Sequence, residues 1–160
     1  MNVIDLLRQA FSNRKRPLTF VANSNISEDE RQATLYFFSH TPSDFTCKGL
    51  KENYDGIYWL TPEAFCFCLP EILIASIRED NKDLIVIDTI IGLLDRTADP
   101  SLWDNFFIDR WTLLTIDECK SVQQWLLWMC EGSCGSFEES QLSRAFDTVE
   151  LLKQRASLHS

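Results

Sequence analysis

The sequence predicts an all-α fold, one compact bundle of about six helices in a single domain over residues 1–160. Its length and 45% apolar composition, with only five Gly and five Pro, suit one globular domain with its own core. The stretch 59–77, WLTPEAFCFCLPEILIASI, is the most apolar part of the chain. Three segments also start with the capping-box pattern, Ser or Thr followed three residues later by Glu, at Ser27, Thr115 and Ser136.

Two helices are predicted in residues 1–57. The first covers residues 2–13, where apolar residues recur on one face, and Pro17 ends it. The apolar piece 18–22 is compatible with a short strand pair. The second helix starts after Ser27 and runs to about residue 39. The segment that follows is polar, and we expect it to be mainly loop because it contains the breakers Pro42, Gly49, Asn53 and Gly56.

The third predicted helix, residues 62–78, forms the centre of the bundle. Thr61 supplies the cap, and Pro62 suits the first helical position because its missing N–H has no partner there anyway. The helix is apolar nearly all round, which is typical of a buried helix. Pro70 removes one backbone donor near its middle, so we expect a kink or a split into two helices.

Three more helices are predicted in the second half. Residues 84–94 are assigned to a helix, although their β-branched run is equally compatible with a strand. Residues 99–114 are less regular, and their aromatic residues are expected to anchor them to the core. The last two helices cover residues 116–131, ending at Gly132, and about 136–156, where apolar residues form a continuous inner face.

Charge and cysteine content limit the classes of function and location. The net charge is −9, and the bases gather in residues 1–20, so direct binding of nucleic acid is disfavoured. No secretory signal and no apolar run long enough to cross a membrane is seen. Six cysteines are then expected to be reduced, and a cytoplasmic location is predicted.

No catalytic, metal or cofactor site is predicted. Cys66 and Cys68 would point to nearly opposite sides of one helix and cannot easily share an ion, while the geometry of Cys130 and Cys134 stays open. Thiol catalysis would require a base, and His40 is the one credible candidate. No glycine-rich turn suggests an oxyanion hole or a phosphate site.

Residues 79–118 are the most acidic region, with ten acids against three bases. One interpretation is a solvated surface, and the other is a docking surface for a basic protein, since charge complementarity raises the association rate. No calcium-loop pattern is present. In the docking interpretation Trp103 and Trp111 would be anchors if exposed, and the field would come from Asp80, Asp83, Asp88, Asp95, Asp99, Asp104 and Asp109.

The central motif resembles a signature of a family of small bacterial domains of unknown function: Trp59-Leu60-x-Pro62-Glu63-Ala64-Phe65-x-Phe67-x-Leu69-Pro70. The segment from Leu114-Thr115 through Trp128 is similar to a later element of the same family. The resemblance implies a bacterial, cytosolic origin and carries over no catalytic residues. In size and acidity the chain also looks like the immunity proteins of bacterial toxin systems, which is a resemblance of type and not of motif.

Three functions follow as hypotheses. The first is a non-catalytic acidic binding protein, an immunity-type inhibitor that occludes the basic cleft of a toxin or effector domain. The second is a hydrolase that uses His40 with a thiol, or a pair of carboxylates. The third is a scaffold or oligomerisation domain.

Overall fold

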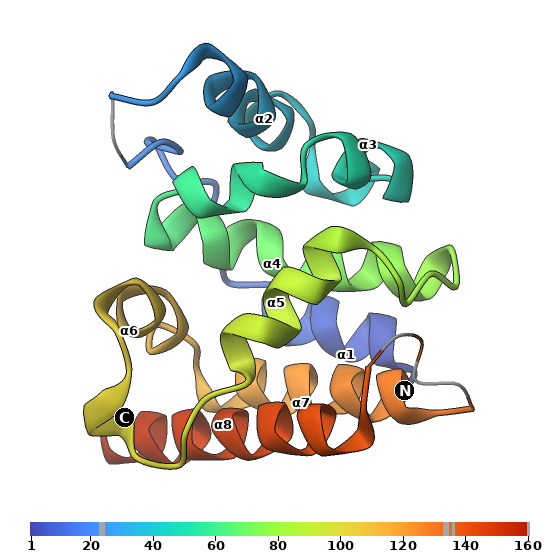
Figure 1. Ribbon diagram of the computed structural model, residues 1–160, viewed down its shortest axis with the longest axis vertical. Helices are drawn as coiled ribbons and strands as arrows, with labels where there is room; N and C mark the ends of the chain where they lie inside the picture. The colour runs from blue at the N-terminus through green and yellow to red at the C-terminus, as the bar shows by residue number, and fades with distance from the viewer. Residues whose placement is uncertain (23–24, 133–134, 136, 160) are drawn as a thin grey trace.

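The computed structural model describes residues 1–22, 25–132, 135 and 137–159, and over these residues the chain is a compact all-α fold, as predicted (Figure 1). The described α-helices are α1 (Val3–Ala10), α2 (Glu28–Ser39), α3 (Cys47–Glu52), α4 (Pro62–Arg78), α5 (Ile85–Leu94), α6 (Asn105–Trp111), α7 (Ile116–Cys130) and α8 (Glu139–Leu158). Short 3₁₀ helices are η1 (Pro42–Asp44), η2 (Tyr54–Trp59) and η3 (Pro100–Leu102).

Local capping determines where several helices begin. The Ser27 and Thr115 side chains each accept a hydrogen bond from the backbone N–H three residues on. The carboxylates of Glu30 and Glu118 accept from the backbone N–H of Ser27 and Thr115 in turn, so both capping boxes are confirmed. The Thr61 hydroxyl accepts from the N–H of Ala64, as predicted for α4. The third predicted box falls on Ser136, which lies outside the described residues.

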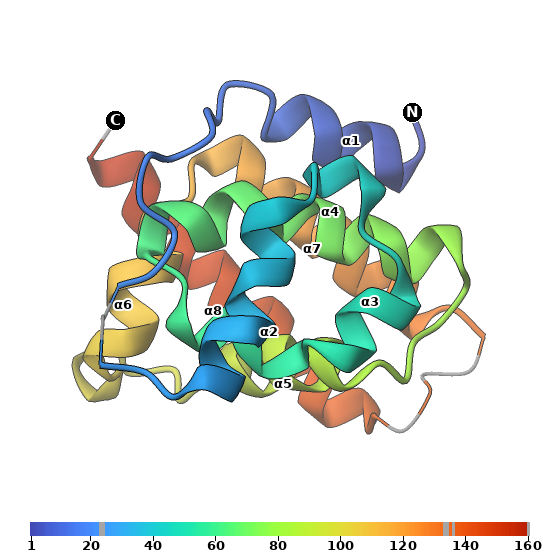
Figure 2. The same cartoon turned by 90° about the horizontal axis from the view of Figure 1, so that it is seen from above.

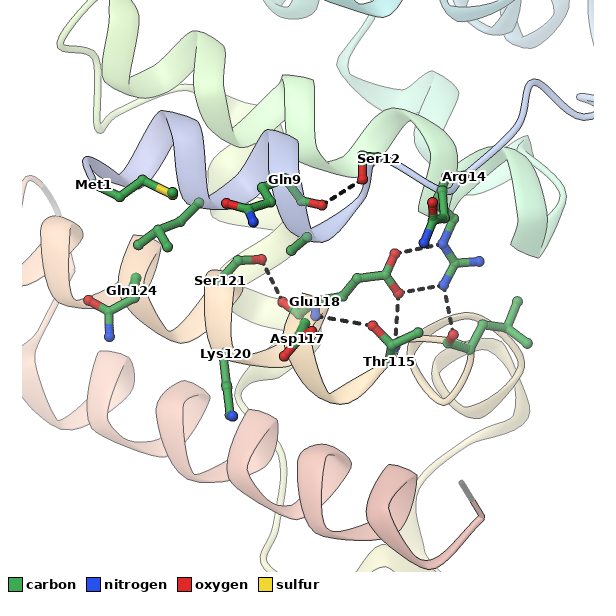
Figure 3. Close-up of a pocket in the computed structure, with 14 residues that line it drawn as sticks. Met1, Gln9, Ser12, Arg14, Thr115, Asp117, Glu118, Lys120, Ser121 and Gln124 are labelled. Carbon is green, nitrogen blue, oxygen red and sulfur yellow. Dashed lines mark hydrogen bonds and ion pairs between the residues drawn. The ribbon is translucent and has the colours of Figure 1, made fainter.

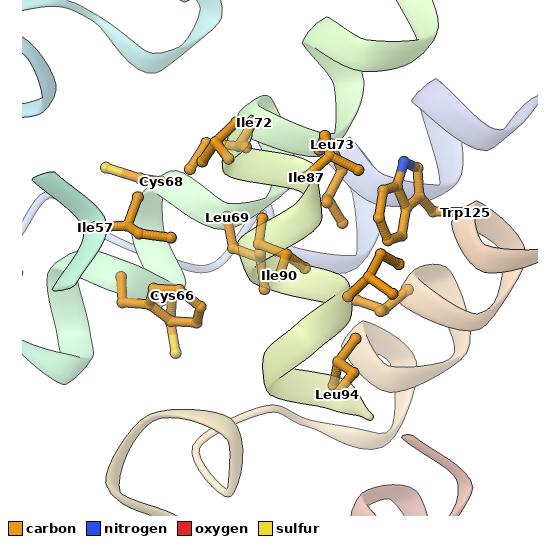
Figure 4. Close-up of a cluster of buried hydrophobic side chains, with 14 of the residues drawn as sticks. Ile57, Cys66, Cys68, Leu69, Ile72, Leu73, Ile87, Ile90, Leu94 and Trp125 are labelled. Carbon is orange, nitrogen blue, oxygen red and sulfur yellow. The ribbon is translucent and has the colours of Figure 1, made fainter. Parts of the chain in front are cut away.

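α4 lies at the centre of the fold and packs against α1, α3 and α6 (Figure 1). It runs as one helix through Pro70, so the chain does not split there. Most of its side chains are buried, and Leu69, Ile72 and Leu73 face Ile87 and Ile90 of α5 in the core (Figure 4). Burial of this apolar surface stabilises the fold by roughly 25 cal/mol per Å².

The remaining helices cover this centre. α7 and α8 form an antiparallel pair along one side, and α1 and α5 each lie between that pair and the rest of the chain (Figures 1 and 2). Residues 85–94 are a helix, which settles the choice between helix and strand left open by the β-branched run. Packing against α8 on one side and η2 on the other outweighs the β propensity of Val and Ile.

The segment 41–57 is mostly helical, so the prediction of a loop was wrong. A side chain on Gly49 would place its Cβ 2.3 Å from the Tyr36 hydroxyl oxygen, and one on Gly56 would lie 2.6 Å from the Ala33 carbonyl oxygen. The two glycines therefore allow α3 and η2 to approach α2 closely and do not interrupt these helices.

The predicted strand pair near residues 18–22 reduces to one antiparallel bridge between Val21 and Leu60 in the part of the chain that the structure describes. Two backbone bonds flank it, Ala22 N–H to Trp59 O (3.1 Å) and Thr61 N–H to Phe20 O (2.8 Å). No helix among the described residues combines the length and apolar composition that a bilayer crossing requires.

Candidate functional site

Three of the seven predicted aspartates have structural partners. Asp95 forms an ion pair with Arg144 (2.6 Å). Asp104 caps α6 through the Phe107 N–H (2.8 Å) and pairs with Arg96 (2.5 Å), and these bonds, the first above all, lower the pKa of its carboxyl.

Asp99 is the third of them. It accepts from the hydroxyl and the N–H of Ser101, which lowers the pKa of its carboxyl. All three side chains stabilise the loop between α5 and α6.

The other four aspartates, Asp80, Asp83, Asp88 and Asp109, are exposed. Partial burial raises the pKa of the Asp88 carboxyl, and the charge of Asp83 raises it further. The α4–α5 loop and the first turn of α5 therefore place like charges near one another. Asp80 and Asp83 lie between α4 and α5 and Asp88 lies in the first turn of α5, whereas Asp109 lies on α6.

Asp80 holds an unusual backbone conformation. Its φ is +48°, in the left-handed region that favours glycine. The N–H of Asn81 donates to Ser76 O (2.8 Å) and that of Asp80 to Ile77 O (3.1 Å), which is the Schellman arrangement that ends a helix. Asp80 also places a negative charge at the negative end of α4, so both features cost stability.

Trp103 and Trp111 are not exposed anchors, which corrects that part of the predicted site. Trp103 is 5% exposed and its indole N–H donates to Thr97 O (3.0 Å), while Trp111 is completely buried. Phe107 and Trp111 lie four residues apart on α6 and stack on each other, and Trp103, just before α6, packs edge-on against Phe107. They anchor α6 to the core, as predicted for this segment.

The aromatic residue of α6 that does reach the surface is Phe106, and no sequence pattern pointed to its partner. Its ring centre lies 5.9 Å from that of Tyr58 in η2. Tyr58 is 40% exposed and Phe106 is partly exposed. No periodic pattern connects residues this far apart in the chain, so only the tertiary structure reveals the pair.

A groove with a volume of about 960 Å³ lies between α1 and the first half of α7 (Figure 3). Met1 and Gln124 lie at one end, and Arg14 and Thr115 lie at the other (Figure 3). Most of the side chains along it are amides, hydroxyls and short apolar groups.

A buried ion pair closes the Arg14 end of the groove. Arg14 donates two bonds to Glu118, from Nε (2.8 Å) and from an Nη (2.7 Å), and a third to Leu113 O (2.7 Å). The bonds to Glu118 raise the pKa of the Arg14 guanidinium. Glu118 is 2% exposed and also accepts from the Thr115 N–H (2.8 Å). Its carboxylate is thus committed to holding α1 against α7.

The thiol and histidine chemistry gains no support from the geometry. Burial raises the pKa of Cys47, Cys66, Cys68 and Cys119 to about 12, so these side chains are thiols near neutral pH. His40 is exposed at the end of α2, where its Nδ1 lies 2.9 Å from Tyr36 O. Its ring packs on that of Tyr36. The hydrolase hypothesis therefore stays a prediction.

No group of three or more His, Cys, Asp or Glu side chains is arranged for a metal ion within residues 1–22, 25–132, 135 and 137–159. Cys130 is exposed at the end of α7. Cys134, whose geometry relative to Cys130 the sequence left open, lies outside the described residues.

Comparisons with known proteins add no relative. No protein-family model, no curated protein and no solved structure matches the chain. The resemblance to a family of small bacterial domains, carried by the residues from Trp59 to Pro70, therefore stays a prediction.

Proposed function

We propose that this chain is a non-catalytic acidic protein that binds a basic protein partner. The observation that carries the proposal is the exposure of Asp80, Asp83 and Asp88 around the α4–α5 loop and of Asp109 on α6, in a chain of net charge −9. An acidic field speeds the encounter with a cationic partner and disfavours phosphate-bearing ones. In its most specific form the proposal is an immunity-type inhibitor, located in the cytoplasm, that covers the basic cleft of a toxin or effector domain.

Several bases that could neutralise this field are used within the fold. Arg8 pairs with Glu71 (3.1 Å), Arg14 with Glu118 and Arg144 with Asp95. Two of the four bases near the N-terminus, Arg8 and Arg14, are thus paired with acids of α4 and α7, and the net charge of the whole chain is negative. The hypothesis of a scaffold or oligomerisation domain has no observation that favours it over binding.

The test is the association of a twelve-residue oligolysine peptide, measured by calorimetry at low and at moderate salt. We expect binding that weakens steeply with salt, because exposed charges are screened beyond about 8–10 Å. The triple variant Asp80→Lys, Asp88→Lys, Asp109→Lys should lose most of this binding.

A control variant changes the net charge equally at other exposed acids, Asp5→Lys, Asp29→Lys and Asp147→Lys. It should retain most of the affinity, because these acids lie on α1, α2 and α8. If the two triple variants lose equal affinity for the peptide, or if the affinity does not depend on salt concentration, a localised acidic docking surface is refuted.

A further inference from the structure

Two aromatic rings and three carboxylates come together where η2, the start of α4 and α6 meet. We call this the aromatic–acid surface: Asp55, Tyr58, Glu63, Phe106 and Asp109. Tyr58 and Phe106 form its centre, with ring centres 5.9 Å apart and planes inclined by 42°. Tyr and Phe that stay partly exposed beside polar groups have the composition of binding hot spots.

The three carboxylates belong to the same segments as this pair or to the adjoining first turn of α4. Asp55 lies one turn before Tyr58 on the 3₁₀ helix, where residues three apart are aligned, and Asp109 follows Phe106 by three residues on α6. Glu63 is exposed in the first turn of α4. None of the three acids forms an ion pair within the described part of the chain. The surface therefore has negative charge left to complement a cation.

Arg110 lies beneath the surface and fixes it in place. It is 6% exposed and donates to Leu60 O (2.9 Å) and Phe106 O (3.2 Å). Its guanidinium carbon lies 3.8 Å from the centre of the Phe106 ring, so that ring already makes one cation–π contact within the fold. Because these contacts join α6 to the start of α4, the aromatic pair is held in position before any partner binds.

The charge around Arg110 is consistent with this arrangement. Burial lowers the pKa of the Arg110 guanidinium, and the carboxylates of Asp109 and Glu63 act in the opposite direction. Both acids thus lie within electrostatic range of Arg110. Glu63 also lies within electrostatic range of Arg14, whose guanidinium is bonded to Glu118. Asp109 and Asp55 are therefore the carboxylates of this surface that are left for an added cation.

We propose that the aromatic–acid surface binds an arginine side chain of a basic protein partner, with the guanidinium on the exposed part of Tyr58 and the carboxylates of Asp55 and Asp109 beside it. This inference rests on the proposed function and names the side chain that the partner presents. Arginine fits better than lysine because its planar, weakly hydrated cation stacks on aromatic rings and bonds to carboxylates in pairs.

The experiment compares nine-residue oligoarginine and oligolysine peptides by calorimetry in one low-salt buffer. The unmodified chain should bind the arginine peptide more tightly, by at most about fivefold, because one exposed cation–π contact sets the upper limit and lysine retains part of that contact. Tyr58→Ala should abolish the preference, while Tyr58→Phe should keep it because the ring remains. The control is Tyr54→Ala, since Tyr54 lies on the same 3₁₀ helix and is also 40% exposed.

The possible outcomes separate this inference from the proposed function. If both peptides bind with salt-dependent affinity but without a preference for arginine, or if Tyr58→Ala and Tyr54→Ala behave alike, the arginine site is refuted and acidic docking stands. If neither peptide binds at low salt, both proposals fail. Helical circular dichroism of each variant confirms that the fold is intact, and Tyr58→Phe provides the comparison if Tyr58→Ala is unstable.

Discussion

The buried ion pair between Arg14 and Glu118 provides the sharpest test of the fold. In Arg14→Met the two bonds to Glu118 are lost, and a carboxylate that is 2% exposed is left without its cation. Breaking a buried ion pair by removing one partner costs roughly 3–5 kcal/mol. In this variant Glu118 still accepts the hydrogen bond from the Thr115 N–H and lies at the positive end of α7, and both features reduce this cost. We therefore expect the free energy of unfolding to fall by about 2–4 kcal/mol.

Removal of the acid should cost less. In Glu118→Gln the guanidinium left behind is 23% exposed and can be hydrated, and Gln can still serve the capping box. We expect a loss of about 1–2 kcal/mol, because a partly exposed charge loses less solvation than a buried one. The predicted order, Arg14→Met worse than Glu118→Gln, follows from the difference in exposure.

Urea unfolding, followed by circular dichroism, measures both variants and their combination. The double variant should be less destabilised than the sum of the single ones, because it contains no unpaired buried charge. A cost below about 1 kcal/mol for Arg14→Met, or strict additivity in the double variant, would show that the pair does not hold α1 on α7.

Three further predictions concern stability and thiol reactivity. Asp80→Gly should stabilise the protein by about 0.5–1 kcal/mol in urea unfolding, since glycine takes the left-handed φ without strain, and a loss would contradict the Schellman geometry. Gly92→Ala should also stabilise the protein by a similar amount, because the added Cβ meets nothing within 4 Å. Gly56→Ala should instead cost about 1–3 kcal/mol, because its Cβ would lie 2.6 Å from Ala33 O. Equal effects of the two substitutions on stability would refute this contrast. Of the five described cysteines, exposed Cys130 should react first with an aromatic disulfide reagent at pH 8. Burial raises the pKa of Cys66, Cys68 and Cys119 to about 12, so the free energy of unfolding should fall as pH rises from about 9 to 12, because the unfolded chain ionises first; a flat alkaline profile would contradict their burial.

Features set by neighbouring residues could be read from the sequence. Thr61 and Pro62 start α4, and Ser27 and Thr115 start α2 and α7, because a cap joins groups that are only three residues apart. The Thr61 cap and an apolar composition nearly all round likewise located the central buried helix, and the net charge of −9 follows from the composition. The all-α class follows from such local signals, which is why it was predictable.

The candidate site depended on contacts between distant segments. Arg14 and Glu118 are 104 residues apart, and Tyr58 meets Phe106 only because α6 folds back onto the start of α4. Trp103 and Trp111 carry the same local pattern whether they face the solvent or the core, and packing around α4 decided that they are buried. The sequence by itself therefore determined the helices and the sign of the surface charge. Only the tertiary structure decided which aromatic and acidic side chains share a surface, because that depends on how the helices pack.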